Sequence, residues 1–340
     1  MPFFVINVVL PVPLRRFFDY LPREQDKADD FQPGTRVRVS FGNQTLHGIV
    51  LGTRSESDVP TNKLKPILDR LDDTPLLSDS DIELCQWLAK YYHHSIGEVL
   101  EHFLPTLLRQ GASLDEANER VWKKLNKTPF KKLGTKQEAL WQLFNQAPLW
   151  AHSQLTKQGF SGAQIQSLEK LGLVEEHYRL PIPSTPAERQ APLSLNSEQQ
   201  QALIVLQQQL GRFQACLLEG VTGSGKTEVY LQLIESALQN NKQVLVLVPE
   251  IGLTPQTVKR FQTRFEVPIA LLHSGLNDRE RLQGWRLAKE GHARILIGTR
   301  SAVFTPLPDL GLIIIDEEHD GSFKQQDGLR YSARDFALVR

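Results

Sequence analysis

The stretch that decides the fold is Gly220 to Thr227, which reads GVTGSGKT and matches a complete phosphate-binding loop. In such a loop, successive backbone N–H groups converge on phosphate oxygens, the lysine reaches the outer phosphates, and the last hydroxyl is placed for magnesium. The motif predicts that the loop binds a nucleoside triphosphate, with Lys226 also acting in catalysis and Thr227 binding the metal. The residues of the loop are Gly220, Val221, Thr222, Gly223, Ser224, Gly225, Lys226 and Thr227.

A second motif completes the prediction of an NTPase, because Leu312 to His319 reads LIIIDEEH. A buried strand that ends in two carboxylates can deliver the first to a metal and the second to an attacking water. We therefore expect Asp316 to ligate Mg²⁺ and Glu317 to act on the water. Two interpretations of His319 stay open. It links the water-polarising end of the site to the segment that follows, or it is a packed histidine that only supports the site.

The chain around both motifs alternates between apolar runs and amphipathic segments. Apolar runs without polar alternation are typical of parallel strands that helices cover on both faces. The sequence thus predicts an α/β lobe with a parallel sheet and a nucleotide at the carboxyl ends of the strands. The expected strands are residues 215–218, 244–248, 269–272, 294–297 and 312–315, and the expected helices are residues 229–238, 257–265 and 278–289.

Length and composition indicate two or three soluble domains, because 340 residues exceed what one hydrophobic core normally organises. The formal net charge is zero, so any nucleic-acid binding must come from local basic surfaces. The only cysteines, Cys85 and Cys216, support neither a disulfide framework nor a zinc site and favour a reducing, cytoplasmic compartment. The apolar stretch 3–10 is too short to span a bilayer and lacks a basic leader, so we interpret it as a strand and expect no membrane partner.

The region before the ATPase motifs changes character twice. Residues 2–65 carry short β-like runs punctuated by Pro and Gly, which predict a small barrel or sandwich. Residues 120–136 contain seven basic residues and no acidic one, and the alternatives there are a solvated linker and phosphate contact. Three short helices and a β-like tail over 136–180 suggest a winged helix. Its acidic tail is a poor match to DNA, so a spacer or protein-docking role is equally open.

Several polar segments near the ATPase motifs are candidates for nucleic-acid contact. The loop 249–256 and the loop 298–301 each leave a strand and offer hydroxyls, amides or an arginine to phosphates, although each could be an ordinary strand-to-helix loop. The segment 323–334 mixes aromatic rings with cations, which suits base stacking on single strands, unless the rings only pin the loop to the core. The DNA candidates in these segments are Thr254, Gln256, Thr299, Arg300, Phe323, Lys324, Arg330 and Tyr331. Gln199, three residues after Asn196, either completes a helix cap or recognises adenine.

Taken in order, these motifs resemble those of superfamily 2 helicases, and specifically the family of primosomal replication-restart helicases. The resemblance implies an N-terminal domain that binds the 3′ end of a nascent leading strand, then a winged helix, then the first of two RecA-like lobes. We expect a small all-β N-terminal domain at 1–110, a basic linker with the α-rich winged helix at 111–180, a Pro-rich linker at 181–194 and the lobe at 195–340. The runs that carry the resemblance are residues 10–14, 18–20, 195–199, 220–230, 248–256, 273–275, 297–304 and 315–334.

Residue by residue, the resemblance implies that Phe18, Asp19, Gly42 and Lys65 form the 3′-end pocket and that Gln199 contacts adenine. It also implies that the aromatic-rich loop couples DNA binding to hydrolysis. The implied activity is ATP-dependent 3′-to-5′ unwinding at stalled or repaired forks, with Mg²⁺ as cofactor, followed by reloading of the replicative helicase. The implied partners are DNA forks, single strands and 3′ ends, primosome proteins, single-stranded DNA-binding protein and the helicase loader, in nucleoid-associated cytoplasm.

The chain departs from the family because it stops at Arg340, inside an expected helix. A full member would add a second lobe with an arginine finger, zinc-binding cysteine clusters and a C-terminal domain, so zinc is expected only there. Arginine fingers elsewhere contribute about 10³ to 10⁵ in rate, so we expect this chain to bind ATP and DNA with little turnover. Two alternatives stay open: a generic superfamily 2 DNA translocase, and a non-enzymatic fork-recognition module whose lobe senses nucleotide.

Overall fold

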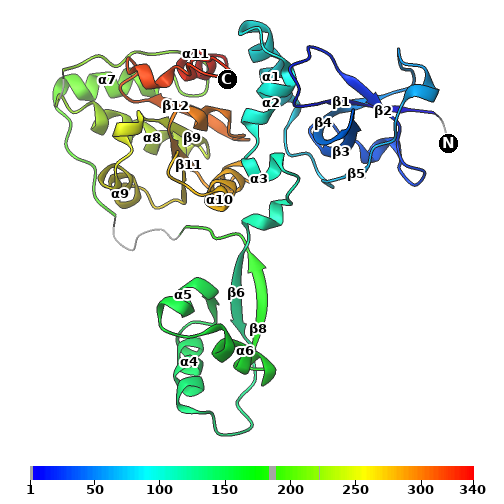
Figure 1. Ribbon diagram of the computed structural model, residues 1–340. Coiled ribbons are helices and arrows are strands. Elements are labelled where there is room, and N and C mark those ends of the chain that lie inside the picture. The colour runs from blue at the N-terminus through cyan, green and yellow to red at the C-terminus, as the bar shows by residue number, and fades with distance from the viewer. Residues whose placement is uncertain (1–2, 184–188, 222) are drawn as a thin grey trace. The chain divides into compact units, whose positions relative to one another are not determined.

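The computed structural model describes residues 3–183, 189–221 and 223–340, and Thr222 of the phosphate-binding loop lies outside them. The chain divides into two compact units (Figure 1). The first joins Met1–Leu114 to Ile182–Arg340, and the second is Asp115–Pro181. Each unit is described separately below.

The first unit begins with one five-stranded sheet in the order β2-β1-β4-β3-β5. Its antiparallel strands are β1 (Val5–Val9), β2 (Phe18–Tyr20), β3 (Arg36–Phe41), β4 (Gln44–Arg54) and β5 (Asp69–Arg70). A parallel bridge between Leu21 and Pro66 brings the two edges of the sheet together. The sheet therefore curls on itself, which favours the barrel alternative over two packed sheets.

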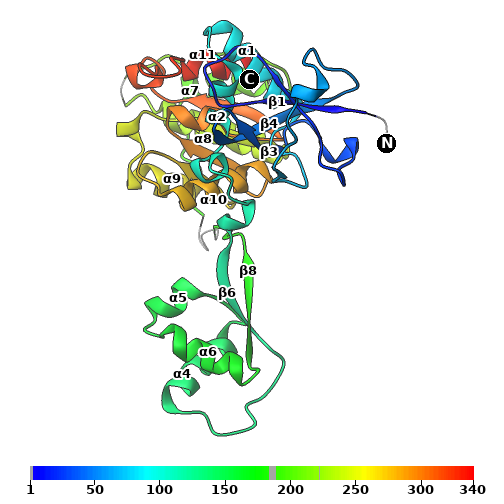
Figure 2. The ribbon, with the colours of Figure 1, turned by 45° about the vertical axis from the view of Figure 1, so that its right-hand side comes forward.

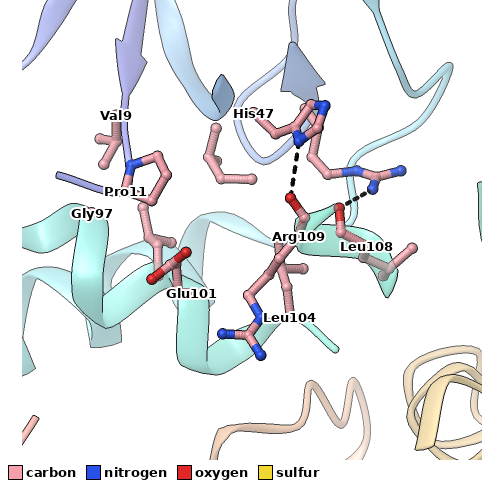
Figure 3. Close-up of a pocket in the computed structure, with 11 residues that line it drawn as sticks. Val9, Pro11, His47, Gly97, Glu101, Leu104, Leu108 and Arg109 are labelled. Carbon is pink, nitrogen blue, oxygen red and sulfur yellow. Dashed lines mark hydrogen bonds between the residues drawn. The ribbon is translucent and has the colours of Figure 1, made fainter. Parts of the chain in front are cut away.

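Three helices follow the sheet, namely α1 (Asp79–Tyr91), α2 (Ile96–Phe103) and α3 (Thr106–Arg109). The expectation of an all-β domain over 1–110 is therefore wrong, because amphipathic helices follow the sheet within that range. Helix α2 packs tightly against the end of β1, because a Cβ on Gly97 would lie only 1.7 Å from the carbonyl oxygen of Leu10. A cavity of about 30 Å³ remains between the sheet and α2–α3 (Figure 3). That is the space of about one water molecule, and His47 closes one side by bonding the Arg109 carbonyl at 3.0 Å.

The remainder of the first unit is a parallel four-stranded sheet in the order β10-β11-β9-β12. The strands are β9 (Gln243–Leu247), β10 (Ile269–Leu272), β11 (Ile295–Gly298) and β12 (Leu310–Ile315). The helices are α7 (Ser197–Gln207), α8 (Lys226–Gln239), α9 (Pro255–Arg264), α10 (Asp278–Lys289) and α11 (Ala333–Val339). Helices α8 and α9 share one core with Val244, Val246 and Ile295, so the expected α/β lobe with a parallel sheet is confirmed.

One strand predicted in this lobe is absent. Residues 215–218 form no strand, and Leu217 is 73 % exposed. A strand forms only by pairing with a neighbouring strand. Strand β12 is an edge of the sheet and pairs with β9 alone among the described strands. The prediction of a strand at residues 215–218 is therefore wrong, because the segment has no neighbouring strand to pair with in the described part of the chain.

The second unit is a three-stranded antiparallel sheet with three helices. The sheet has the order β7-β6-β8, with β6 (Glu119–Lys124), β7 (Leu149–Ala151) and β8 (Val174–Arg179), and the helices are α4 (Thr135–Gln146), α5 (His152–Lys157) and α6 (Gly162–Lys170). The basic run 120–136 is therefore not a linker throughout, because its first part is the central strand and carries the fully buried Trp122. Opposite charges on β8 neutralise this strand, since Arg120 pairs with Glu176 at 2.7 Å and Lys123 with Glu175 at 3.6 Å.

The segment that returns the chain to the first unit is held along the ATPase lobe. Gln190 N donates to the carbonyl oxygen of Thr263 at 2.8 Å, and Leu193 N donates to the Glu228 carboxylate at 3.1 Å. Part of the expected Pro-rich linker, residues 184–188, lies outside the described residues. No helix in the described ranges is long and apolar enough to cross a bilayer.

Candidate nucleotide and DNA sites

The phosphate-binding loop is folded around the start of α8. Gly223 and Gly225 adopt left-handed backbone angles, with φ of 81° and 83°, which glycine enters without steric cost. Lys226 Nζ donates to the carbonyl oxygens of Gly220, at 2.6 Å, and of Val221, at 3.3 Å. The ammonium thus lies over the loop itself, where phosphate oxygens would take the place of these carbonyls.

The two expected magnesium ligands meet at one side chain, Tyr230 on the first turns of α8. Its hydroxyl donates to Asp316 Oδ2 at 3.2 Å and is also hydrogen-bonded with Thr227. Burial, followed by the negative charge of Asp316, raises the pKa of Tyr230, so the phenol stays protonated and can donate. Motifs that stand far apart in the sequence therefore converge at the carboxyl end of β12.

These groups fit a nucleotide with a hard divalent cation. Thr227 and Asp316 offer oxygen ligands, and Mg²⁺ is usually held by one or two carboxylates together with substrate phosphates rather than by a protein cage. The described part of the chain has no cluster of three or more His, Cys, Asp and Glu side chains that could hold a metal. The Ser224 hydroxyl is buried and has no hydrogen-bond partner among the described residues, so the loop keeps an unused polar group for an anion.

Glu317 and His319 lie just beyond β12 and face solvent. The Glu317 side chain is 52 % exposed and that of His319 is 77 % exposed, with His319 Nε2 3.7 Å from Glu317 Oε2. Glu317 has a φ of 49°, which side chains rarely adopt and which is concentrated at functional sites. Exposure of His319 does not support the interpretation as a packed histidine. The predicted catalytic roles of both residues stay predictions.

Gln199 serves as a helix cap and also contacts the loop. Its Oε1 accepts from Asn196 N at 2.9 Å, while Gln199 N donates back to Asn196 Oδ1 at 2.9 Å. Its Nε2 donates to the carbonyl oxygen of Ser224 at 2.8 Å. Both ends of the amide are thus engaged by protein, and adenine would have to replace one of these bonds. Adenine contact by Gln199 stays a prediction.

The four residues expected in a 3′-end pocket line one open cavity of about 610 Å³. Phe18 and Asp19 come from β2, Gly42 from the β3–β4 turn, and Lys65 from the segment before β5. Its walls also carry Arg15, Arg16, Arg54, Lys63, Phe17, Asp58 and Tyr20. The wall therefore has five cations against two carboxylates, together with aromatic rings, in a volume suited to a nucleotide-sized ligand.

Asp19 is held at this cavity by two side chains that sequence reasoning did not single out. Asn7 Nδ2 donates to Asp19 Oδ1 at 2.8 Å, and Ser57 Oγ donates to Asp19 Oδ2 at 2.7 Å. Each carboxylate oxygen can accept a further bond, so Asp19 is oriented yet still able to bind a donor. The polar Asn7 within an apolar strand was the one sequence signal that could have indicated a side chain that orients Asp19.

The candidates in the loops after β9 and β11 separate into exposed and buried groups. Thr254 caps α9 by accepting from Thr257 N at 3.2 Å, and both Thr254 and Gln256 are exposed to solvent. Thr299 is only 5 % exposed, and Arg300 Nη1 donates to the carbonyls of Ser322 at 2.9 Å and Lys324 at 3.1 Å. In this structure Arg300 holds the backbone of the aromatic-rich loop, and Thr299 is buried, so neither side chain is free to contact phosphates.

The aromatic-rich loop departs from its predicted role in base stacking. Phe323 and Tyr331 are each 3 % exposed, so neither ring has a free face for a base. Their packing supports the other alternative, in which the rings pin the loop to the core. Lys324 and Arg330 are exposed and remain available for phosphate contact. The burial of Tyr331 arises in part from ring contacts with Phe304 and His102, which are distant in the sequence and which no local pattern reveals.

Two models of known protein domains match this chain. Residues 7–105 match the model of the "3'DNA-binding domain (3'BD)", and residues 196–338 match that of the "DEAD/DEAH box helicase". The second match implies ATP use with a divalent metal.

Curated relatives extend the similarity over nearly the whole chain. This chain is 43 % identical over 354 residues to the replication restart protein PriA of Haemophilus influenzae, and the match covers 98 % of this chain and 47 % of the relative. It is 32 % identical over 400 residues to PriA of Bacillus subtilis, covering 96 % of this chain and 50 % of the relative. The chain thus spans about half the length of the curated relatives it matches. With both domain matches in the expected order, the chain belongs to the replication restart protein PriA family.

Proposed function

We propose that the whole protein is an ATP-dependent 3′-to-5′ DNA helicase that recognises stalled or repaired forks and helps to reload the replicative helicase. The observation that carries the proposal is the presence, in one compact unit, of a phosphate loop joined through Tyr230 to Asp316 and of a basic cavity organised around Asp19. A motor site and an end-binding site together suit an enzyme that starts on a particular DNA structure.

At the ATP site, backbone N–H groups of the loop and Lys226 would bind the phosphates, and Thr227 with Asp316 would hold Mg²⁺. A bound Mg²⁺ would supply positive charge that offsets the negative charge developing on the transferred phosphate. Glu317 would orient and deprotonate the attacking water, which its exposure next to the end of β12 allows. For this chain we propose binding of ATP with little turnover, since the arginine finger belongs to the second lobe of the family.

Hydrolysis is tested in the full-length protein with Glu317→Gln. The amide keeps the shape of the side chain but cannot take a proton, so we expect ATP binding at wild-type affinity and a loss of ATPase of at least about 10²-fold. Turnover at the wild-type rate would refute the role of Glu317. Assays with and without single-stranded DNA separate a motor from a non-enzymatic module, because only a motor hydrolyses ATP faster when DNA is present.

At the cavity, Asp19 would accept a hydrogen bond from a terminal 3′-hydroxyl while nearby cations bind the preceding phosphates. A terminal 3′-phosphate would instead bring a dianion against the carboxylate. The discrimination would thus follow from the fixed negative charge of Asp19 in a wall where cations outnumber carboxylates. A generic superfamily 2 translocase would have no such preference. We also propose that residues 115–181 form a winged helix that acts as a spacer or docking domain.

The end preference is measured by fluorescence anisotropy of this chain on short single strands that end in 3′-hydroxyl or 3′-phosphate, at one fixed salt concentration. A hydrogen bond to a charged group contributes about 1.5 to 3 kcal/mol, so we expect at least a 10-fold preference for the hydroxyl. Asp19→Asn should abolish the preference. Asp58→Asn makes the same charge change in the same cavity and should preserve it. Equal binding of both ends by the wild-type chain would refute the 3′-end site.

A further inference from the structure

The N-terminal helices contact the ATPase lobe through Tyr92 and Phe103, and α1 and α11 lie near each other in both views (Figure 1, Figure 2). Tyr92, the residue directly after α1, accepts a hydrogen bond on its hydroxyl from Ser332 N at 3.1 Å. The same hydroxyl lies 3.5 Å from Asp335 Oδ2. Tyr92 therefore supplies a partner to the first turn of a helix in the other half of the unit.

An aromatic cluster continues this contact. Phe103 of α2 meets Phe304 at 5.3 Å and Phe336 at 6.0 Å between ring centroids, and Phe304 meets Tyr331 at 4.7 Å. All four rings are at most 3 % exposed, so they form one closed core shared by the two halves of the unit. Ring pairs at these spacings interact more favourably than their buried area alone predicts.

Hydrogen bonds fix the orientation of this cluster. Trp285 Nε1 on α10 donates to the carbonyl oxygen of Phe103 at 2.8 Å, and both groups are buried. From the other side, Arg300 holds the loop backbone through Ser322 and Lys324. The loop between Asp316 and α11 thus has anchors on the ATPase lobe and on the N-terminal helices at once.

Strand β1 connects the same helices to the end-binding cavity. Asn7, which orients Asp19, is on β1, and β1 leads into Leu10, whose carbonyl oxygen touches Gly97 at the start of α2. Phe103 ends α2. A short series of packed groups therefore runs from Asp19 along β1 and α2 to the aromatic-rich loop, without a flexible segment between them.

We propose that Tyr92 and Phe103 are positioning residues that make the setting of the aromatic-rich loop, and with it ATP hydrolysis, depend on occupancy of the 3′-end cavity. The inference rests on the proposed function. Neither residue touches DNA or nucleotide. They act by holding the start of α11 and the ring of Tyr331, so that a small displacement of α2 by a bound DNA end is passed to the segment that follows Asp316 and Glu317.

The test uses the full-length protein and the variant Tyr92→Phe, which removes one hydroxyl and keeps the ring. Its matched control is Tyr91→Phe, because Tyr91 is the adjacent residue, is 56 % exposed and stacks on Trp87. ATPase is measured on forks whose leading strand ends in 3′-hydroxyl and on identical forks that end in 3′-phosphate. The quantity compared is the ratio of the two rates.

We expect Tyr92→Phe to lower this ratio about fivefold, the effect of losing one ordinary hydrogen bond from the coupled state. The affinity of the full-length protein for a strand that ends in 3′-hydroxyl should change little. A residue with only a structural role would lower both rates equally and leave the ratio unchanged. In an Asp19→Asn background, Tyr92→Phe should have no further effect on the ratio, because the cavity no longer senses the end.

The outcomes are distinguishable. A wild-type ratio of one would refute the proposed 3′-end function itself. A wild-type ratio well above one that Tyr92→Phe leaves intact, or that Tyr91→Phe lowers equally, would overturn the positioning role of Tyr92 alone. A lowered ratio in Tyr92→Phe with an intact ratio in Tyr91→Phe supports it.

Discussion

Loss of the buried ion pair between Arg36 and Asp72 should strongly lower the free energy of unfolding of the N-terminal domain. The Arg36 side chain is 1 % exposed and that of Asp72 is 7 % exposed. Arg36 Nε and Nη2 bind the two carboxylate oxygens at 3.0 and 2.7 Å, and Nη1 donates to the carbonyl oxygen of Leu108 on α3. One guanidinium therefore ties β3, the segment before α1, and α3 together.

Arg36→Met removes the charge and keeps the length of the side chain. The Asp72 carboxylate would then stay buried without its cation. It would keep only the hydrogen bond from the main-chain N–H of residue 36, which is 2.8 Å long in the wild-type chain. Breaking a buried pair in this way costs about 3 to 5 kcal/mol. Arg38→Met, two residues along the same strand, is the control, because Arg38 and Asp69 are 45 % and 39 % exposed and such pairs contribute about 0.2 to 1 kcal/mol.

The assay follows alkylation of Cys85 across a urea series in a Cys216→Ser background. Cys85 is fully buried on α1, and burial raises the pKa of its thiol well above the usual value, so it reacts only when this region unfolds. The midpoint should fall far more for Arg36→Met than for Arg38→Met, and adding Asp72→Leu should restore most of the loss. A difference between the two variants below about 1 kcal/mol would refute the reasoning, since it would mean that Asp72 finds solvent or another donor.

Two further predictions concern the ATPase lobe. In the native chain Cys216 should react with iodoacetamide at a rate near that of a free thiol, because the segment before the phosphate-binding loop is exposed; protection as strong as that of Cys85 would show that the segment is paired as a strand. In the full-length protein, Tyr230→Phe should raise the Mg²⁺ concentration for half-maximal ATPase several-fold, since Thr227 and Asp316 lose their shared partner. An unchanged Mg²⁺ requirement with a lowered maximal rate would instead assign Tyr230 to packing.

Sequence reasoning located the features whose signal is local. Strands β9 to β12 are continuous apolar runs, and helices α9 and α10 have clear periodicity and caps, so their positions were predicted within about two residues. The phosphate-binding loop and the Asp316–Glu317 pair are read from spacing. The residues proposed for the 3′-end pocket came from resemblance alone, and the structure brings them to one cavity.

What could not be predicted depends on partners far away in the chain. Strand β6 was not predicted, because its basic residues are typical of a solvated linker. Their ion-pair partners, Glu175 and Glu176, lie on β8, more than 50 residues later in the sequence. Tyr331 carries the same composition signal whether it stacks on a base or on Phe304, and only the fold brings Phe304 to it. Tyr230 looked like one more apolar position on α8, because periodicity reports which face is buried and not what its hydroxyl meets.

The free edge of β12 has a consequence for the behaviour of the molecule at high concentration. Strand β12 reads LGLIII, carries no charge, and pairs on one side only among the described strands. Unpaired N–H and C=O groups on an uncharged, β-branched strand are a template for the addition of another strand, and natural proteins usually cover or charge such an edge. Two copies of this chain should therefore associate edge to edge in a concentration-dependent way. Sedimentation equilibrium would detect the dimer, and a strictly monomeric profile up to high concentration would show that the edge is shielded in solution.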